Sequence, residues 1–349
     1  MNSDNKEWKE FKVKNLFSVE KCKCPNASKL GSGIIPYVGA TNKNNGVISF
    51  AKAECHLITK GSCIAFICDG QGSVGYSIYK SEDFIGSTTV KIGRNPFLNR
   101  QIGMFFVSAL DKNRFLYSYG HKRNEKRLLN ETILLPSNNK LPDYEYMENY
   151  AKEIEKKKLD QYITYIKKRL SSLVYKEIPK LEEKEWKEFF IKNLFEDIQR
   201  GKRLTKSNQI EGKVPYISSS SINNGIDNFI NNDTNIRKFS NCLSLANSGS
   251  VGACFYEPFE FIASDHITHL KNDKYNKYIY LFISCILNRL KEKYNFNREI
   301  NDKRISREKI LLPTNKNNQP DYEYMEQYIK NLEIKKLNQY LYFLNRKYK

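Results

Sequence analysis

The sequence predicts an α+β protein with two similar α/β domains and two long helices that pack on each other. Three observations support this fold class. The chain has 349 residues, enough for two or three domains of ordinary size. Its second half repeats its first at an offset of 177 to 179 residues. Each half begins with short apolar runs separated by Asn, Gly and Ser, and ends in a Lys- and Glu-rich segment with apolar residues at helical spacing.

The repeat is clearest in two blocks at opposite ends of each half. Glu7 to Phe17 matches Glu185 to Phe195 at nine of eleven positions, and the sequence of Pro142 to Glu148 returns unchanged from Pro320. Shorter matches lie between these blocks in the same order: Pro-Tyr at 36 and 215, Asn-Asn-Gly at 44 and 223, Gly-Ser-Val-Gly at 72 and 249, and Ile-Leu-Leu-Pro at 133 and 310. A repeat of this length is a duplicated domain. Two such domains on one chain usually hold a ligand that has two similar halves.

The composition points to a polyanionic partner. Lys and Arg number 58 against 39 Asp and Glu, which gives a formal charge of +19. Apolar residues make up 40% of the chain, so we expect packed cores and a charged surface. We expect a cytoplasmic protein, because no apolar run approaches the roughly 20 residues of a membrane-spanning helix and the polar start at Met1 is no signal peptide. Of eight cysteines, only Cys63 and Cys242 correspond between the halves, which argues against a disulfide framework or a metal site.

In the globular parts, residues 1–141 and 179–319, we expect strands and short helices. Apolar runs predict strands at Cys63 to Cys68 and Thr88 to Ile92. Asn45-Gly46 and Asn224-Gly225 suit the positive φ angles of a type I′ hairpin turn. Helical spacing of apolar residues predicts helices over 98–110 and 277–290.

Residues 142–178 and 320–349 are expected to form the two long helices. Proline suits the first turn of each. The apolar stripes have coiled-coil-like spacing and skip across Lys156 to Lys158 and Lys335-Lys336. Their members are Met147, Tyr150, Ile154, Leu159, Ile163, Ile166, Leu170 and Leu173 in the first, and Met325, Tyr328, Leu332, Leu337, Leu341 and Leu344 in the second. The first helix would measure roughly 50 Å, long enough to set a distance between the domains.

Catalytic motifs are weak. Gly70 to Gly75 has the glycine spacing of a dinucleotide loop, but a strand pattern follows where a helix is needed, so we expect a tight turn. The nearest string to an amino-methyltransferase motif is Asn95-Pro96-Phe97, and no carboxylate pair with a lysine marks a nuclease. Asp265-His266 could suggest hydrolase chemistry, but its counterpart is Thr88-Thr89, which favours a surface or satisfied histidine. We therefore expect no catalytic residues, no metal site and no cofactor in this chain.

One pair of loops differs between the halves inside a shared frame. Small hydroxyl and amide side chains are suited to reading base edges in the major groove, and the alternative is an ordinary polar hairpin loop. The candidates for DNA contact are Thr41, Asn42, Lys43 and Asn44 in the first half, and Ser218, Ser219, Ser220, Ser221 and Asn223 in the second.

Basic clusters interleaved with aromatic residues supply candidates for phosphate contact. Ordinary solvated surface is the alternative for each of these side chains. One cluster follows Phe195, and the others precede Ile-Leu-Leu-Pro near Tyr117, Tyr119, Tyr294 and Phe296. The candidates are Lys202, Arg203 and Lys206, then Lys122, Arg123 and Lys126, and then Arg298, Lys303 and Arg304.

The duplicated order of Trp-Lys-Glu-Phe, Pro-Tyr, Asn-Asn-Gly, Gly-Ser-Val-Gly, Ile-Leu-Leu-Pro and a long helix resembles the specificity subunit of type I restriction-modification systems, or the similar subunit of type IIB systems. The resemblance spans nearly the whole chain. It implies two α/β target-recognition domains related by a pseudo-twofold axis and separated by an antiparallel coiled coil. The first half departs from the pattern by lacking Gly-Lys-Arg after Asn-Leu-Phe, so the roles of Lys202 and Arg203 do not carry over to it.

The resemblance implies a non-catalytic subunit that reads a bipartite duplex DNA target, one domain per half-site. It also implies two methyltransferase partners that carry S-adenosylmethionine and, in type I systems, ATP-driven restriction subunits. The alternative from another class is a coiled-coil RNA-binding or structural protein that clamps a polyanion without sequence preference. An enzyme is the third reading. The sequence gives neither the target nor the choice between type I and type IIB.

Overall fold

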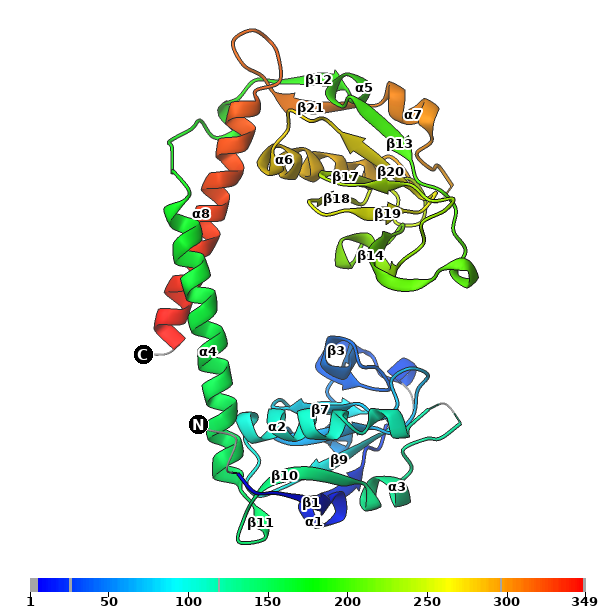
Figure 1. Ribbon diagram of the computed structural model, residues 1–349, viewed down its shortest axis with the longest axis vertical. Coiled ribbons are helices and arrows are strands. Elements are labelled where there is room, and N and C mark those ends of the chain that lie inside the picture. Colours follow the sequence, from blue (N-terminus) through cyan, green and yellow to red (C-terminus); the bar gives the residue numbers. More distant parts are fainter. Residues whose placement is uncertain (1–5, 25–26, 119, 296, 348–349) are drawn as a thin grey trace. The chain divides into compact units, whose positions relative to one another are not determined.

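The computed structural model describes residues 6–24, 27–118, 120–295 and 297–347. The chain divides into two compact units, Met1–Tyr162 and Ile163–Lys349. Both combine small β-sheets with helices (Figure 1), so the predicted α+β class is confirmed. The boundary between the units falls inside the long helix α4 (Tyr144–Ser171), and the domain limits expected from the sequence remain a prediction.

The first unit contains three small sheets. One is antiparallel throughout, with the order β2 (Ser18–Lys21), β9 (Val90–Arg94), β6 (Cys63–Ile67) and β7 (Ser77–Lys80). Another is mixed, because β3 and β8 run parallel, and has the order β4 (Val47–Ala51), β3 (Ser32–Val38), β8 (Phe84–Gly86) and β5 (Ile58–Thr59). The third is β1 (Trp8–Lys12), β10 (Thr132–Asn138) and β11 (Leu141–Pro142).

Besides the first part of α4, the α-helices of this unit are α1 (Val13–Leu16), α2 (Arg100–Asp111) and α3 (Glu125–Asn130). The predicted helix over 98–110 is confirmed as α2. It begins where the Asn99 side chain accepts a hydrogen bond from the Ile102 amide, which satisfies one free donor of the first turn. The apolar face of α2 packs on β6 and β7. Phe66 on β6 and Phe106 on α2 are fully buried in the resulting core.

The second unit repeats this plan, except that its small sheet has two strands where the first unit has three. Its two four-stranded sheets are β13 (Asp197–Arg200), β20 (Ile267–Lys271), β17 (Cys242–Ala246) and β18 (Cys254–Glu257), and β15 (Ile226–Ile230), β14 (Glu211–Ile217), β19 (Phe261–Ala263) and β16 (Lys238–Phe239). The small sheet is β12 (Trp186–Phe190) with β21 (Lys309–Pro313), and the helices are α5 (Ile191–Leu194), α6 (Lys277–Leu287) and α7 (Asp302–Arg307). The duplication seen in the sequence is therefore a duplication of fold.

The Asn-Gly turns have the positive φ angles expected from the sequence. Asn44, Asn45 and Gly46 have φ of 48°, 52° and 77°. They form one 3-10 turn at the end of a longer loop, residues 39–46, that joins β3 to β4. The predicted two-residue hairpin turn is wrong, because the Gly39 amide bonds the Gly46 carbonyl and the intervening residues make a turn of their own.

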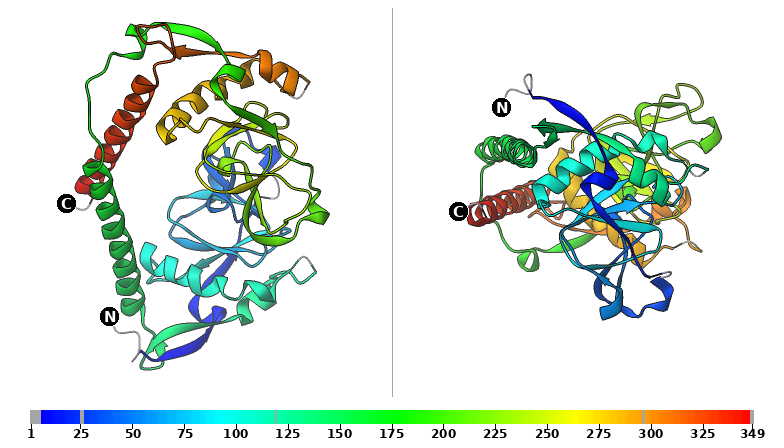
Figure 2. Two further views of the ribbon diagram at one scale, coloured as in Figure 1. Left: turned by 45° about the horizontal axis from the view of Figure 1, so that its top comes forward. Right: turned by 90° about the horizontal axis from the view of Figure 1, so that it is seen from below.

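The two long helices are α4 and α8 (Tyr322–Lys347), both continuous in each view (Figure 2). Asp143 and Asp321 cap them by accepting hydrogen bonds from Tyr146 and Tyr324 amides. The first helix ends at Ser171, short of the predicted 178. The chain beyond it runs along α8, where amide side chains of Gln327 and Asn331 bond the carbonyls of Val174 and Lys176. These bonds satisfy backbone groups that a longer helix would have bonded internally.

The apolar stripes of the two helices are buried only in part. Met147, Ile166, Met325 and Leu344 are buried, whereas Tyr150, Ile154 and Leu332 are 36%, 44% and 37% exposed. The remaining members, Leu159, Ile163, Leu170, Leu173, Tyr328, Leu337 and Leu341, are half-buried. Tyr150 and Ile154 line an open apolar groove of about 510 Å³ with Trp8, Met104 and Leu134, so their exposure comes from this groove.

An ion pair joins the C-terminal part of α4 to α8 within the second unit. Arg169 Nε donates to Glu333 Oε1 at 2.6 Å, and its Nη2 also bonds the Tyr278 hydroxyl of α6. The hydrogen bond from Arg169 holds the pKa of Glu333 below its usual range. No helix in the described part of the chain is long and apolar enough to cross a membrane.

Candidate nucleic-acid interface

In the first unit, three loops meet beyond the ends of the strands. These are residues 39–46, 68–76 and 86–89, and we call them the first loop cluster. The Ser87 amide bonds the Val38 carbonyl at 2.8 Å, and the Cys68 amide bonds the Thr89 carbonyl at 3.0 Å. Gly70 lies so close to Ala40 that a Cβ there would be 2.8 Å from the alanine methyl. The cluster is therefore a single braced surface, and the predicted tight turn at Gly70 to Gly75 is part of it.

The second unit has the equivalent surface in residues 218–225, 247–252 and 263–266, the second loop cluster. The Ser264 amide bonds the Ile217 carbonyl at 3.0 Å, and the Asn247 amide bonds the His266 carbonyl at 2.9 Å. These are the counterparts of the two backbone bonds in the first cluster. Ser250 adds a bond of 3.1 Å from its amide to the Ser219 carbonyl. The two units thus present different side chains on the same backbone scaffold.

The hydroxyl and amide residues predicted from the sequence lie in these clusters. Asn42, Lys43, Asn44, Ser221 and Asn223 are exposed, and Thr41, Ser218, Ser219 and Ser220 are half-buried. Part of the hydroxyl set serves the loops themselves, since Thr41 accepts from the Lys43 amide and Ser220 accepts from the Ile222 amide.

Basic residues enter the second cluster from the end of β13. Gly201 and Lys202 donate backbone bonds to Ile267 and Ala263, which places the Lys202 backbone beside the cluster. The Lys202 amine donates to Asn235 Oδ1 at 3.4 Å, and Arg203 and Lys206 are exposed. Gly201 is required, because a Cβ there would lie 2.2 Å from the Ser264 carbonyl.

In the first unit the glycine that allows the close approach is on the other strand, β8. Its glycine is Gly86, where a Cβ would lie 2.2 Å from the Cys22 sulfur. The missing Gly-Lys-Arg of the first half is therefore a local difference in packing, and no Lys-Arg pair enters the first cluster from β2.

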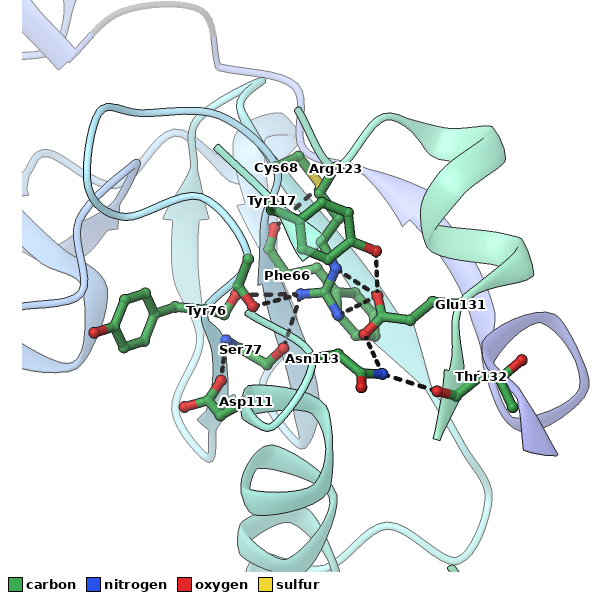
Figure 3. Close-up of polar contacts among 11 residues, drawn as sticks. Phe66, Cys68, Tyr76, Ser77, Asp111, Asn113, Tyr117, Arg123, Glu131 and Thr132 are labelled. Carbon is green, nitrogen blue, oxygen red and sulfur yellow. Dashed lines mark hydrogen bonds and ion pairs between the residues drawn. The ribbon is translucent and has the colours of Figure 1, made fainter. Parts of the chain in front are cut away.

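Arg123 is not a DNA contact, which corrects the prediction. Its guanidinium is fully buried, with Nε 2.8 Å and Nη2 2.7 Å from Glu131 Oε2, and Nη1 donates to Ser77 Oγ at 2.9 Å and to the Gly75 carbonyl at 3.2 Å (Figure 3). The Tyr117 hydroxyl also donates to Glu131, and burial raises the pKa of that hydroxyl. Arg123 instead anchors the described residues of the basic loop 117–124 beside the first cluster.

The second unit anchors its matching loop with a different cation. Glu308, the counterpart of Glu131, pairs with Lys293 at 2.8 Å and accepts from the Tyr294 hydroxyl, whose pKa is raised to about 12 by burial. The buried position of Arg123 is taken by Ile300. The Ile300 amide bonds the Asn247 carbonyl at 3.0 Å, so this loop also adjoins its cluster.

The other predicted basic residues lie on the surface. Lys122 pairs with Asp69 at 2.7 Å, which lowers the pKa of that carboxyl. Exposed positions are held by Lys126, Arg298, Lys303 and Arg304. Tyr119 and Phe296 lie outside the described residues. In the described part of the chain, no group of three or more His, Cys, Asp and Glu could hold a metal ion.

Sequence reasoning gave no DNA-binding role to Asp265 and His266 of the second cluster, or to Arg200 and Arg237 beside it. Arg200 Nε donates to the Asp265 carbonyl at 3.1 Å, and Arg237 in turn donates to the Arg200 carbonyl. No motif marks the two arginines. The pairing of β13 with β20 brings Arg200 to the loops, and the Ala263 amide bonds the Arg237 carbonyl. The one available signal was that Asp265-His266 replaces Thr88-Thr89 in the other half.

Two matched, braced loop clusters next to basic loops are the features of a duplicated DNA-binding protein. The chain matches the family described as the type I restriction modification DNA specificity domain, over residues 5–164 and again over 183–340. It belongs to this family, that of the DNA-specificity subunits of restriction-modification systems.

One relative supports this assignment by sequence, and one solved structure is similar in fold. The chain is 32% identical over 334 residues to the Type II restriction enzyme BgcI specificity subunit S.BcgI of Heyndrickxia coagulans, covering 94% of this chain and 95% of the relative. The crystal structure of the type I restriction-modification S subunit from M. genitalium shares its fold, with a TM-score of 0.50 at 16% identity over 99% of this chain and 94% of that one.

Proposed function

We propose that each unit binds one half of a bipartite duplex DNA target through its loop cluster, with the adjoining basic loop on the phosphates. The supporting observation is that matched backbone bonds hold unlike side chains in the two clusters, Thr41 to Asn44 in one and Ser218 to Ser221 in the other. A shared scaffold with variable polar contents suits two different base sequences. The net charge of +19 suits binding to the backbone.

Catalysis in this proposal belongs to partners in the cytoplasm. The chain docks two methyltransferase subunits, which bind S-adenosylmethionine and transfer the methyl group, and in a type I system also restriction subunits. The two long helices form an antiparallel coiled coil that sets the separation of the half-sites. The Arg169–Glu333 pair and the buried Ile166 and Leu344 support this role for α4 and α8.

Selection from random duplex DNA tests the proposal. The chain in complex with its methyltransferase partner is expected to enrich two short fixed blocks at one fixed spacing. A polyanion clamp would enrich no sequence, and that result would reject the proposal.

Alanine replacement of one loop at a time provides the matched control. Replacing Ser218 to Ser221 with four alanines should relax one block by about 1 to 3 kcal/mol for each lost base contact. Replacing Thr41 to Asn44 in the same way should relax the other block only. Relaxation of both blocks by one replacement would show that the units do not read independently.

A further inference from the structure

Asp265 and His266 occupy a braced turn that has an exact backbone counterpart in the first unit. The Ile267 amide bonds the Ser264 carbonyl at 3.1 Å, as the Val90 amide bonds the Ser87 carbonyl at 2.9 Å. The counterparts of Asp265 and His266 are thus Thr88 and Thr89. At the same place on the scaffold, an acid and an imidazole replace two hydroxyl side chains.

The His266 ring is held by one nitrogen and presents the other. Its Nδ1 makes a hydrogen bond with the hydroxyl of Ser248, which is 3% exposed. The His266 side chain is 53% exposed, and Nε2 lies 3.9 Å from Asp265 Oδ1, beyond hydrogen-bond distance. In the tautomer in which the Ser248 hydroxyl donates to Nδ1, the ring proton is on Nε2. This leaves an oriented N–H donor and a carboxylate acceptor side by side on the surface.

The Asp265 backbone is fixed while its carboxylate remains available. Arg200 donates to the Asp265 carbonyl, and the only ion pair of the carboxylate within the described residues is the long contact with His266. A phosphate next to this carboxylate would be repelled. Lys202 and Arg203, which enter from β13, are better placed to bind the phosphates.

We propose that Asp265 and His266 together read a G·C base pair in the half-site bound by the second unit. The proposal rests on the proposed function and specifies part of its recognition. In the major groove guanine presents the acceptors N7 and O6, and its cytosine presents the N4 amino donor. His266 Nε2–H matches the guanine edge, and the Asp265 carboxylate matches the amino group. The first unit lacks this pair, because the Thr89 hydroxyl is already bonded to Ser87 Oγ at 3.0 Å.

The test compares DNA selections by the wild-type complex with its methyltransferase partner and by complexes carrying His266→Ala, His266→Gln or Asp265→Asn. His266→Ala should reduce the preference at one G·C pair of one block by about tenfold, the low end for a lost base contact. His266→Gln keeps a donor and should restore part of this preference. Asp265→Asn should change the preference at the same base pair. Thr89→Ala, the matched control in the first unit, should leave that base pair unaffected.

Several outcomes distinguish this inference from the proposed function. If the wild-type complex enriches no paired blocks, the proposed function fails. If it enriches both and His266→Ala keeps every preference, or weakens all positions equally, the G·C assignment is wrong. Thermal unfolding of each variant identifies loss of fold. If His266→Ala does not fold, His266→Gln and Asp265→Asn decide the question, because unchanged preferences in both would overturn it.

Discussion

Removing the buried cation Arg123 should destabilise the first unit strongly. Arg123→Ala leaves Glu131 charged inside the protein, with only Tyr117 and Asn113 to donate to it. It also frees the carbonyl of Gly75 and the hydroxyl of Ser77, which the guanidinium now satisfies.

The expected loss of stability follows from the burial of the pair. Both side chains have no exposed surface, and breaking a buried ion pair by removing one partner costs about 3 to 5 kcal/mol. In a unit of this size, 3 kcal/mol corresponds to a fall of about 6 to 12 °C in the unfolding midpoint. Replacing both charges, in Arg123→Met with Glu131→Gln, should recover much of the loss, since no charge then remains unpaired.

Tryptophan fluorescence makes this measurement specific to one unit. The chain has two tryptophans, Trp8 in the first unit and Trp186 in the second, and each stacks on a phenylalanine at 6.2 and 6.3 Å. In a Trp186→Phe background, urea unfolding followed through Trp8 reports the first unit. Lys126→Ala, an exposed change on the next helix, should stay within about 0.5 kcal/mol. A loss below about 1 kcal/mol for Arg123→Ala would refute the argument that this pair anchors the loop.

Three other perturbations have defined outcomes. Binding of the complex to its DNA should weaken with salt: the logarithm of the affinity against the logarithm of the salt concentration should have a slope of about −0.9 per phosphate contact, or about −5 to −9 for roughly 6 to 10 contacts. Replacing both Lys202 and Arg203 with alanine should make the slope shallower by about 2. A wild-type slope shallower than about −2 would contradict the phosphate contacts. Burial raises the pKa of Glu257 to about 7, so the stability that its neutral form provides is complete below about pH 4 and is lost as pH rises through 7. Urea unfolding at pH 5 and pH 8 should therefore show a smaller loss for Glu257→Gln than for the wild type, and equal losses would contradict the assignment. Adding one turn of about 5.4 Å to both α4 and α8 should lengthen the unspecified gap between the two blocks of the DNA target by about 1.6 base pairs. Neither block should change, and methylation-site sequencing measures both outcomes. An unchanged gap would contradict the role of the helices in setting the separation of the half-sites.

The sequence was sufficient for the duplicated plan because that plan depends on local patterns. The buried strand Cys63–Ile67 is a continuous apolar run, and the helix that begins at Arg100 has its cap at Asn99 and its apolar residues at helical spacing. The end of α4 was overestimated for a reason that local patterns do not contain. The residues after Ser171 leave the helix to bond amide side chains about 155 positions away on α8.

The candidate site was predictable only where its residues are adjacent in the sequence. Thr41 to Asn44 and Ser218 to Ser221 stand out because the motifs on either side of them, Pro-Tyr and Asn-Asn-Gly, are the same in both halves of the internal repeat. The burial of Arg123 could not be foreseen, because its partners Ser77 and Glu131 come from two other elements. A basic residue next to exposed Lys122 has the same appearance in sequence whether it faces solvent or a carboxylate in the core.

The divergence of the two units extends below their surfaces, and this limits how freely their recognition loops can be exchanged. In the first unit the basic loop depends on Arg123 and on Ser77 of β7; in the second, Ile300 and Cys254 occupy the corresponding buried positions. Moving residues 117–124 alone into the second unit would bury a guanidinium without the serine hydroxyl that now accepts from it. The side-chain hydrogen bonds of the short loops 41–44 and 218–221 are to neighbours within two residues. The longer-range bonds of Ser218 and Ser219, to Gly225 and Ser250, join backbone atoms and do not depend on the side chains. Exchange of specificity should therefore succeed with these loops alone, whereas exchange of the basic loops requires their buried anchors as well.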